Sequence, residues 1–99
     1  MSRTPDSTPV LSLSGVDFST THGMNESLTP VVMVTSKYPI GHVDFFINGE
    51  LIDKKTTSPY SFSFNPSNIT SISNNNSLTF IAYDTFLNKG TFSTQLLIQ

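Results

Sequence analysis

The chain has 99 residues, the size of one domain, and no apolar run near the about 18 residues that a membrane-spanning helix requires. Its net charge is −2, and its five scattered lysines and arginines do not form the basic stripe of a protein that binds nucleic acid. It has no cysteine, which excludes disulfides and thiolate metal sites, and its surplus of Ser, Thr and Asn over Ala, Glu and Lys favours strands and turns.

Both ends of the sequence suggest a piece of a longer chain. Residues 1–7 are polar, lack the apolar stretch of a signal sequence, and are interpreted as a disordered lead or linker. Residues 8–99 form one predicted domain, which ends directly on the strand-like segment 91–99. We therefore expect a signal or anchor to lie outside this fragment.

Apolar patterning predicts two strands in the first third of the chain. Residues 9–14 alternate between apolar and polar side chains, as a half-buried strand does. A loop follows, with at most a brief strand at 16–20. Residues 31–34 are all apolar, which is typical of a central strand, and Pro30 suits its first position because proline lacks a ladder donor.

The segment "HVDFFINGELI" predicts a hairpin. Val43, Phe45 and Ile47 share one face of a strand, and Asn48-Gly49 separates it from a second strand at 50–55. An Asn-Gly pair favours a type I′ turn, in which both residues have positive φ.

The second half continues with alternating strands and one helical turn. Residues 60–64 place aromatic side chains on one face, and Asn65 and Pro66 fit the start of a single helical turn that tucks Ile69 and Ile72 under the sheets.

A loop is predicted at 74–76, followed by a strand at 77–84, a hairpin loop at 85–90 and a last strand at 91–99. Six or seven strands with turn signals about every 8–12 residues are the pattern of an all-β, two-sheet sandwich with antiparallel strands. The residues expected in its core are Val43, Phe45, Ile47, Phe62, Phe80, Ala82, Phe92, Leu96 and Ile98.

Several of these residues also form motifs. They are Ile40, Val43, Phe45, Phe46, Ile47, Asn48 and Gly49, then Thr57, Pro59, Tyr60, Ser61 and Phe62, then Ala82, Asp84, Asn88 and Gly90. In this order they resemble the bacterial immunoglobulin-like domains that occur in strings in cell-surface and secreted proteins, and the front half is similar to domains of gut-bacterial surface lipoproteins. The resemblance implies an immunoglobulin-like sandwich of about seven strands, an extracellular or cell-surface location, and flanking domains of the same chain as partners. It implies no shared catalytic residues.

The sequence offers no convincing enzymatic chemistry. There is no Gly-x-Ser-x-Gly elbow for a nucleophile, and His22 and His42 are expected to be solvated surface residues. Asp84 and Asn88 could bind calcium as oxygen donors, but two ligands are too few, and an Asx-type turn is the preferred interpretation. We therefore predict a non-enzymatic domain without a catalytic site, metal or cofactor.

Two groups of apolar residues are candidates for contact with a partner. Phe46, Ile81, Tyr83 and Leu97 are expected on the outer face of one sheet, and Phe86-Leu87 is expected at a hairpin tip where related domains often carry Asp-x-x-Gly-Asn. A neighbouring domain, a protein partner or a glycan could cover the outer face. The sequence therefore favours a spacer or docking module, with a carbohydrate- or protein-binding adhesion module as the alternative, and exposed flat rings would distinguish the second from the first.

Overall fold

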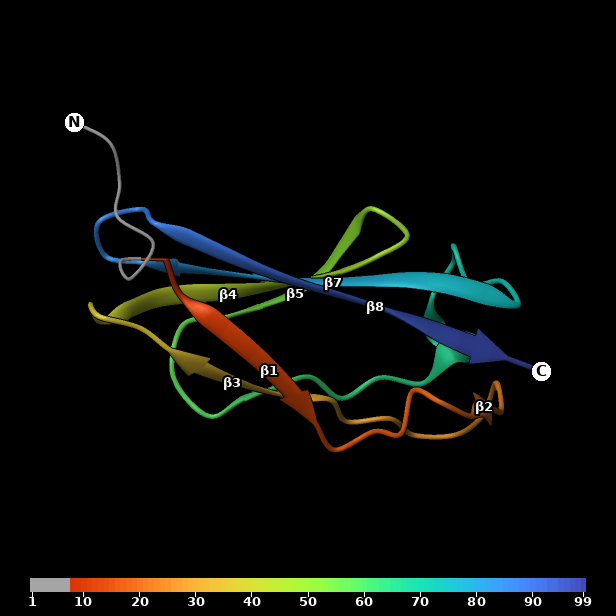
Figure 1. The fold of residues 1–99 in the computed structure, drawn as a ribbon. Helices are drawn as coiled ribbons and strands as arrows, with labels where there is room; N and C mark the ends of the chain where they lie inside the picture. The colour runs from red at the N-terminus through yellow and green to blue at the C-terminus, as the bar shows by residue number, and fades with distance from the viewer. Residues whose placement is uncertain (1–7) are drawn as a thin grey trace.

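The computed structural model describes residues 8–99 as two β-sheets packed face to face (Figure 1). One sheet has the order β1-β3-β6 and the other has the order β2-β8-β7-β4-β5. The elements are β1 (Val10–Ser14), β2 (Thr21–His22), β3 (Val31–Thr35), β4 (Ile40–Ile47), β5 (Glu50–Lys55), β6 (Tyr60–Ser61), a 3-10 turn η2 (Pro66–Asn68), β7 (Asn75–Asp84) and β8 (Lys89–Ile98). The predicted all-β, two-sheet sandwich is confirmed, whereas the linker predicted at 1–7 lies outside the described residues.

The Asn48-Gly49 hairpin forms as predicted. Asn48 has φ of 53° and Gly49 has φ of 84°, the left-handed values that a type I′ turn requires. Asn48 also fastens the turn to β7, because its backbone N–H donates to the carbonyl of Ser77 and its side-chain oxygen accepts from the N–H of Ser77. The hairpin is therefore tied to the sheet at its tip as well as along its strands.

The core is built around three phenylalanines. Phe45 on β4 and Phe80 on β7 are cross-strand neighbours, and their rings stack with centroids 4.8 Å apart. Phe62, which follows β6, packs on both at 5.3 and 5.9 Å. All three are buried, as are five other predicted core residues, and Phe92 packs half-buried against them. The prediction of these core faces is confirmed.

The chain between β1 and β3 differs from the prediction. Residues 16–20 do not form a strand, because the carboxylate of Asp17 accepts a hydrogen bond from the Ser19 N–H at 3.0 Å and turns the chain. The strand lies later, at β2, and it pairs in parallel with β8. The sandwich therefore contains one parallel pair among the described strands.

The predicted loop at 74–76 is also wrong. β7 begins at Asn75, and the Asn76 side chain is almost fully buried. Its amide donates to the carbonyls of Ser73 and Leu96, and its oxygen accepts from the Ser73 N–H. Three asparagines in a row favour a loop in solution, but here one of them satisfies buried backbone groups that would otherwise lack partners. The turn at η2 is confirmed, with Ile69 buried beneath the sheets.

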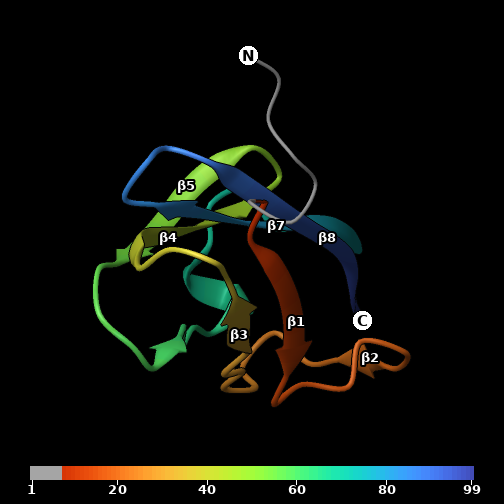
Figure 2. The ribbon, with the colours of Figure 1, turned by 60° about the vertical axis from the view of Figure 1, so that its left-hand side comes forward.

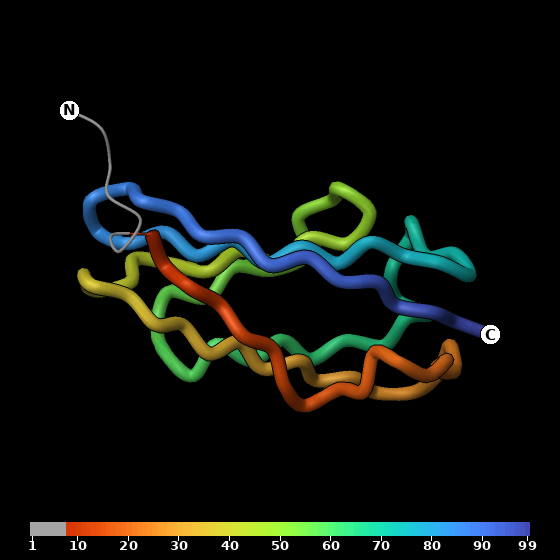
Figure 3. The backbone as a smooth tube through the Cα atoms, viewed as in Figure 1, coloured from red at the N-terminus to blue at the C-terminus, as the bar shows by residue number. Residues whose placement is uncertain are grey.

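The two ends of the described chain lie at opposite ends of an elongated molecule of 46 × 23 × 21 Å (Figures 1 and 3). Pro9 passes so close to Gly90 that a Cβ at Gly90 would lie 1.8 Å from the Pro9 carbonyl oxygen. At the other end, the N–H of Gln99 donates to the carbonyl of His22. A chain that enters and leaves in this way can be joined end to end with similar units.

We expect Gly49→Val to lower the free energy of unfolding by about 1–3 kcal/mol, because a β-branched residue resists positive φ. Steric clash would not contribute, since no described heavy atom lies within 4 Å of a Cβ at Gly49. Gly23→Val is the matched control, because Gly23 is equally open and its φ lies outside the left-handed region. Thermal unfolding measures both, and equal melting temperatures for the two variants would contradict the prediction.

We expect Phe80→Ala to cost about 3–5 kcal/mol, because it removes a fully buried ring that stacks on Phe45. Phe86→Ala removes a ring that is 68% exposed and should change stability by no more than about 0.5 kcal/mol. Urea denaturation of both variants tests the assignment. A similar loss in the two would mean that the core does not depend on the Phe45–Phe80 stack.

Candidate functional site

The outer face of the five-stranded sheet carries three of the four predicted patch residues together. Phe46 pairs with Thr79 on β7, which places it diagonally next to Ile81, and Tyr83 is the next outward residue of β7. Each of these three apolar side chains is half-buried. Leu97 is half-buried as well, but it pairs with Asn75 near the start of β7, about 20 Å along the strand from Ile81. The structure therefore does not bring Leu97 to the other three.

Two polar residues lie within this face: His42, which was expected to be solvated and is half-buried, and Asp44, which the sequence did not single out. The His42 ring stacks on Tyr83 with centroids 4.6 Å apart, so one face of the tyrosine ring is covered. Asp44 lies in the row between His42 and Phe46 and is 9% exposed. Its Oδ2 is 3.7 Å from His42 Nε2, and its buried Oδ1 has no hydrogen-bond partner among the described residues. In the sequence, the position of Asp44 between apolar strand residues could have indicated this buried carboxylate.

The β7–β8 loop presents Phe86 and Leu87 at one end of the molecule. Their side chains are 68% and 74% exposed, the largest exposures of bulky apolar residues in the described chain. Tyr38, from the β3–β4 loop, packs edge-on against Phe86 with centroids 4.6 Å apart. We call these three residues the apolar tip. The sequence predicted two of them but missed Tyr38, which only the fold brings to the β7–β8 loop.

Asp84 holds the apolar tip in one conformation. Its Oδ1 accepts from the N–H groups of Phe86 and Asn88 at 2.8 and 2.9 Å, and its Oδ2 accepts from the Asn88 side-chain amide at 2.8 Å. The Asx-type turn predicted for Asp84 is therefore present. Leu87 has φ of 64°, which costs a residue with a Cβ about 1–2 kcal/mol. The tip therefore exposes a leucine in an unfavourable backbone conformation on a hydrogen-bonded turn.

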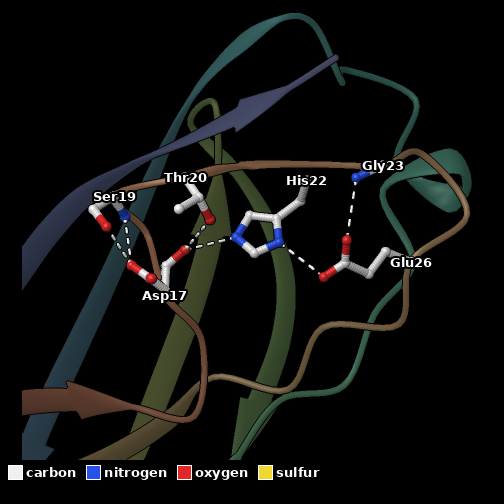
Figure 4. A network of polar contacts seen from close by, with 6 residues as sticks. All are labelled: Asp17, Ser19, Thr20, His22, Gly23 and Glu26. Atoms are coloured by element: carbon white, nitrogen blue, oxygen red, sulfur yellow. Dashed lines mark hydrogen bonds and ion pairs between the residues drawn. The ribbon is translucent and has the colours of Figure 1, made fainter.

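His22 is not the solvated surface residue that the sequence predicted. It is 8% exposed, and both of its ring nitrogens face oxygen atoms (Figure 4). Nε2 lies 2.7 Å from the backbone carbonyl oxygen of Asp17, and Nδ1 lies 2.8 Å from Oε2 of Glu26. The other Glu26 oxygen accepts from the N–H of Gly23 at 3.3 Å. Because β2 includes His22, this network ties the edge strand to the residues on either side of it in the β1–β3 connection.

The charged imidazolium fits the network best, since only that form donates from both nitrogens. The Asp17 carbonyl, with help from Glu26, raises the pKa of His22 above its ordinary value of 6.5. The hydrogen bond from His22 lowers the pKa of Glu26 below 4.5. A hydrogen bond from Ser19 likewise lowers the pKa of Asp17. These groups form a small ion-paired staple in the β1–β3 connection, in which the hydroxyls of Ser19 and Thr20 donate to Asp17.

Residues 8–99 contain no group of three or more histidine and acidic side chains that could hold a metal ion. Over the same residues, no helix has the length and apolar character needed to cross a bilayer. The features that stand out on the described surface are the apolar tip and the partly covered outer face, and apolar surface of this kind often marks a site of contact.

Comparisons with known proteins agree on the fold. The family model described as "Bacterial Ig domain" matches residues 19–93. Among solved structures, the fibronectin(III)-like modules of Clostridium thermocellum CbhA are similar, with a TM-score of 0.76 at 22% sequence identity, which shows a shared fold alone. This match covers 93% of the present chain and 47% of that chain, so the present chain spans about half the length of that solved structure. No curated protein matches the chain.

The His22 staple predicts a pH dependence of stability. Because the folded pKa of His22 is raised, its contribution is fully present below about pH 6.5 and is lost as the pH rises through the raised value. The lowered pKa of Glu26 acts in the opposite sense, and its contribution is lost only as the pH falls through that lowered value. Melting temperatures between about pH 5.5 and about pH 8.5 should therefore fall on the alkaline side.

The matched variants are His22→Gln, which cannot titrate, and Glu26→Gln, which keeps an acceptor but carries no charge. The fall in melting temperature should disappear in the first and become shallower in the second. If the parent chain and His22→Gln lost stability equally above about pH 6.5, the staple would not be the cause.

Proposed function

This chain belongs to the bacterial Ig domain family, and we propose that it acts as a non-catalytic spacer and docking module of a larger bacterial surface or secreted protein. The observation that carries the proposal is the apolar tip, which lies at the end of the sandwich where the chain enters. The family and the fold support a module without catalysis. Location at the cell surface or outside the cell is part of the same proposal.

The position of the tip supports docking to the preceding part of the chain. Pro9 packs against Gly90, which follows the β7–β8 loop, and the N–H of Thr85 donates to the carbonyl of Pro39. The β3–β4 and β7–β8 loops and the start of β1 therefore lie at the same end of the sandwich, on the left in Figure 1 and turned toward the viewer in Figure 2. A neighbour attached before β1 would be next to the tip from the outset, which raises its effective concentration there.

The conformation of the tip supports docking as well. Asp84 fixes Phe86, Tyr38 supports its ring, and Leu87 remains exposed despite its positive φ. Apolar side chains that are held rigid lose little conformational entropy on binding, so their burial contributes more of its free energy to association. The exposed Leu87 with positive φ is unfavourable for the isolated domain, and such local strain is expected where a neighbouring domain covers the surface.

A second candidate function is adhesion through the outer face. The observation that favours it is the buried Oδ1 of Asp44, which lacks a donor among the described residues and lies in the same face as Phe46 and Tyr83. A glycan hydroxyl or a peptide amide could donate to it only after the side chains that bury it move aside. The stacking of His42 on Tyr83 and the partial burial of both rings make this face less suited to sugar stacking than an open platform.

The test joins this chain to the domain that precedes it in its parent protein. Phe86→Ser with Leu87→Asn removes the apolar tip, and asparagine tolerates positive φ. Val10→Ser with Met33→Ser is the matched control, because these two residues are 64% and 63% exposed on the other sheet. Small-angle scattering and thermal unfolding of the joined protein are the measurements.

We expect both double variants to melt close to the parent chain when isolated, because surface substitutions change stability by about 0.5 kcal/mol or less. In the joined protein, only the tip variant should show a lower melting temperature than the parent, because its neighbour no longer stabilises it. Its maximum dimension in small-angle scattering should also be larger. Unchanged scattering and melting in the tip variant would refute docking. A glycan array tests the adhesion alternative with the double variant Phe46→Ser, Tyr83→Ser. Adhesion through the outer face requires that the parent chain binds a glycan and that the double variant does not.

A further inference from the structure

We propose that the open edge of β3 binds a short, uncharged, extended segment of another polypeptide by strand addition. The site is the apolar groove between β3 and the segment that leads into β6. It is independent of the proposed docking function, since neither Phe86 nor Leu87 lines it. Three features carry the proposal: an unpaired stretch of strand edge, an apolar groove directly beside it, and a lining without charge.

The edge of β3 next to β6 is only partly paired. β1 pairs with every residue of β3, whereas β6 pairs only with Val31 and Val32. The chain bends at 56–59, just before β6 begins at Tyr60, so β6 does not extend along the rest of β3. Within the described chain, no backbone hydrogen bond joins Val34 to that bent segment.

The backbone groups of Val34 face this open side. The N–H of Phe62 donates to the carbonyl of Pro30, and Leu28 and Phe64 exchange both of their backbone hydrogen bonds. These bonds show that the backbone hydrogen-bonding groups of Leu28 and Pro30 point toward the β6 side. Since the hydrogen-bonding groups of a strand alternate between its two sides, those of Val34 point the same way as those of Pro30. Val34 therefore presents one donor and one acceptor to an incoming chain.

The groove beside this edge has a volume of about 390 Å³. Val31 to Val34 form one wall, and Ser58, Pro59 and Tyr60 form the other. No charged side chain lines it, so it does not favour a charged ligand, and most of its lining is branched apolar or aromatic. Its size admits a few residues of extended polypeptide with small branched apolar side chains, rather than a helix about 10 Å across.

The ladder between β3 and β6 fixes how the segment binds. Val32 pairs with Tyr60, so a ladder continued in the same register would place residue 58 opposite Val34. The bend at 56–59 turns residue 58 out of the ladder, so an incoming chain can take the position opposite Val34. A segment bound there would extend the existing ladder, exchange two hydrogen bonds with Val34 and insert one apolar side chain into the groove. This is the backbone-led mode of peptide recognition, in which pockets for alternate side chains give the selectivity.

The test uses the 99-residue chain and a synthetic probe, acetyl-Thr-Val-Thr-Val-Thr-amide. A second probe carries N-methyl groups on its central peptide bonds, which remove the backbone donors and keep the side chains. Amide shifts in two-dimensional NMR report where each probe binds, and hydrogen exchange reports protection of the Val34 N–H. Ser58→Leu fills the groove at an exposed lining residue, and Thr57→Leu is the matched control next to it, outside the lining.

We expect saturable shifts confined to β3 and the groove, with slower exchange at Val34. N-methylation should weaken binding by about tenfold or more, since it removes the hydrogen bond that the probe donates to the Val34 carbonyl and its methyl groups obstruct the close approach of the two strands. Ser58→Leu should weaken binding to the same extent, and Thr57→Leu should leave it unchanged.

Each of four results would overturn the proposal. The first is the absence of shifts at millimolar probe, and the second is equal binding of the N-methylated probe. The third is shifts at the apolar tip or the outer face in place of β3. The fourth is protection of Val34 by concentration-dependent self-association without any probe, which would make a second copy of this chain the occupant.

Discussion

The stacking of Phe45 on Phe80 determines which face of the five-stranded sheet packs against the three-stranded sheet. The two rings are cross-strand neighbours, and Phe62 closes on them from the opposite layer. Because side chains alternate along a strand, fixing this one pair fixes the direction of every other residue on β4 and β7. A slip of one residue would place charged Asp44 in the core, where an unpaired charge is strongly unfavourable.

The surfaces available for contact follow from that arrangement. With Phe45 and Phe80 inward, Phe46, Ile81 and Tyr83 must lie on the outer face, together with the polar pair His42 and Asp44. The strands run along the length of the sandwich, and the loops that join them lie at its two ends. The apolar tip belongs to one of these ends, and the open edge of β3 arises because β6 pairs with only two of its residues.

Small polar residues, rather than disulfides, hold the connections in place. Asp84 organises the β7–β8 loop, Asn76 organises the chain before β7, and His22 organises the connection between β1 and β3. Asp84 and Asn76 each satisfy several backbone groups, and His22 satisfies the carbonyl of Asp17, which removes the penalty of leaving such groups without partners. Their hydrogen bonds are mostly local, so each stabilises its own loop without contributing to the apolar core.

The sequence alone determined the fold class, the Asn48-Gly49 turn and the core faces, because strand periodicity and turn chemistry are local properties of the chain. It also indicated an exposed Phe86-Leu87, since that loop departs from the familiar pattern of such domains. Other features depended on residues that meet only after folding. Tyr38 reaches Phe86 from another loop, His22 is buried because its connection folds back on β8, and Leu97 is separated from Ile81 by the register of β7 and β8. The tertiary structure decided these because strand pairing and loop packing depend on distant partners, which no local pattern specifies.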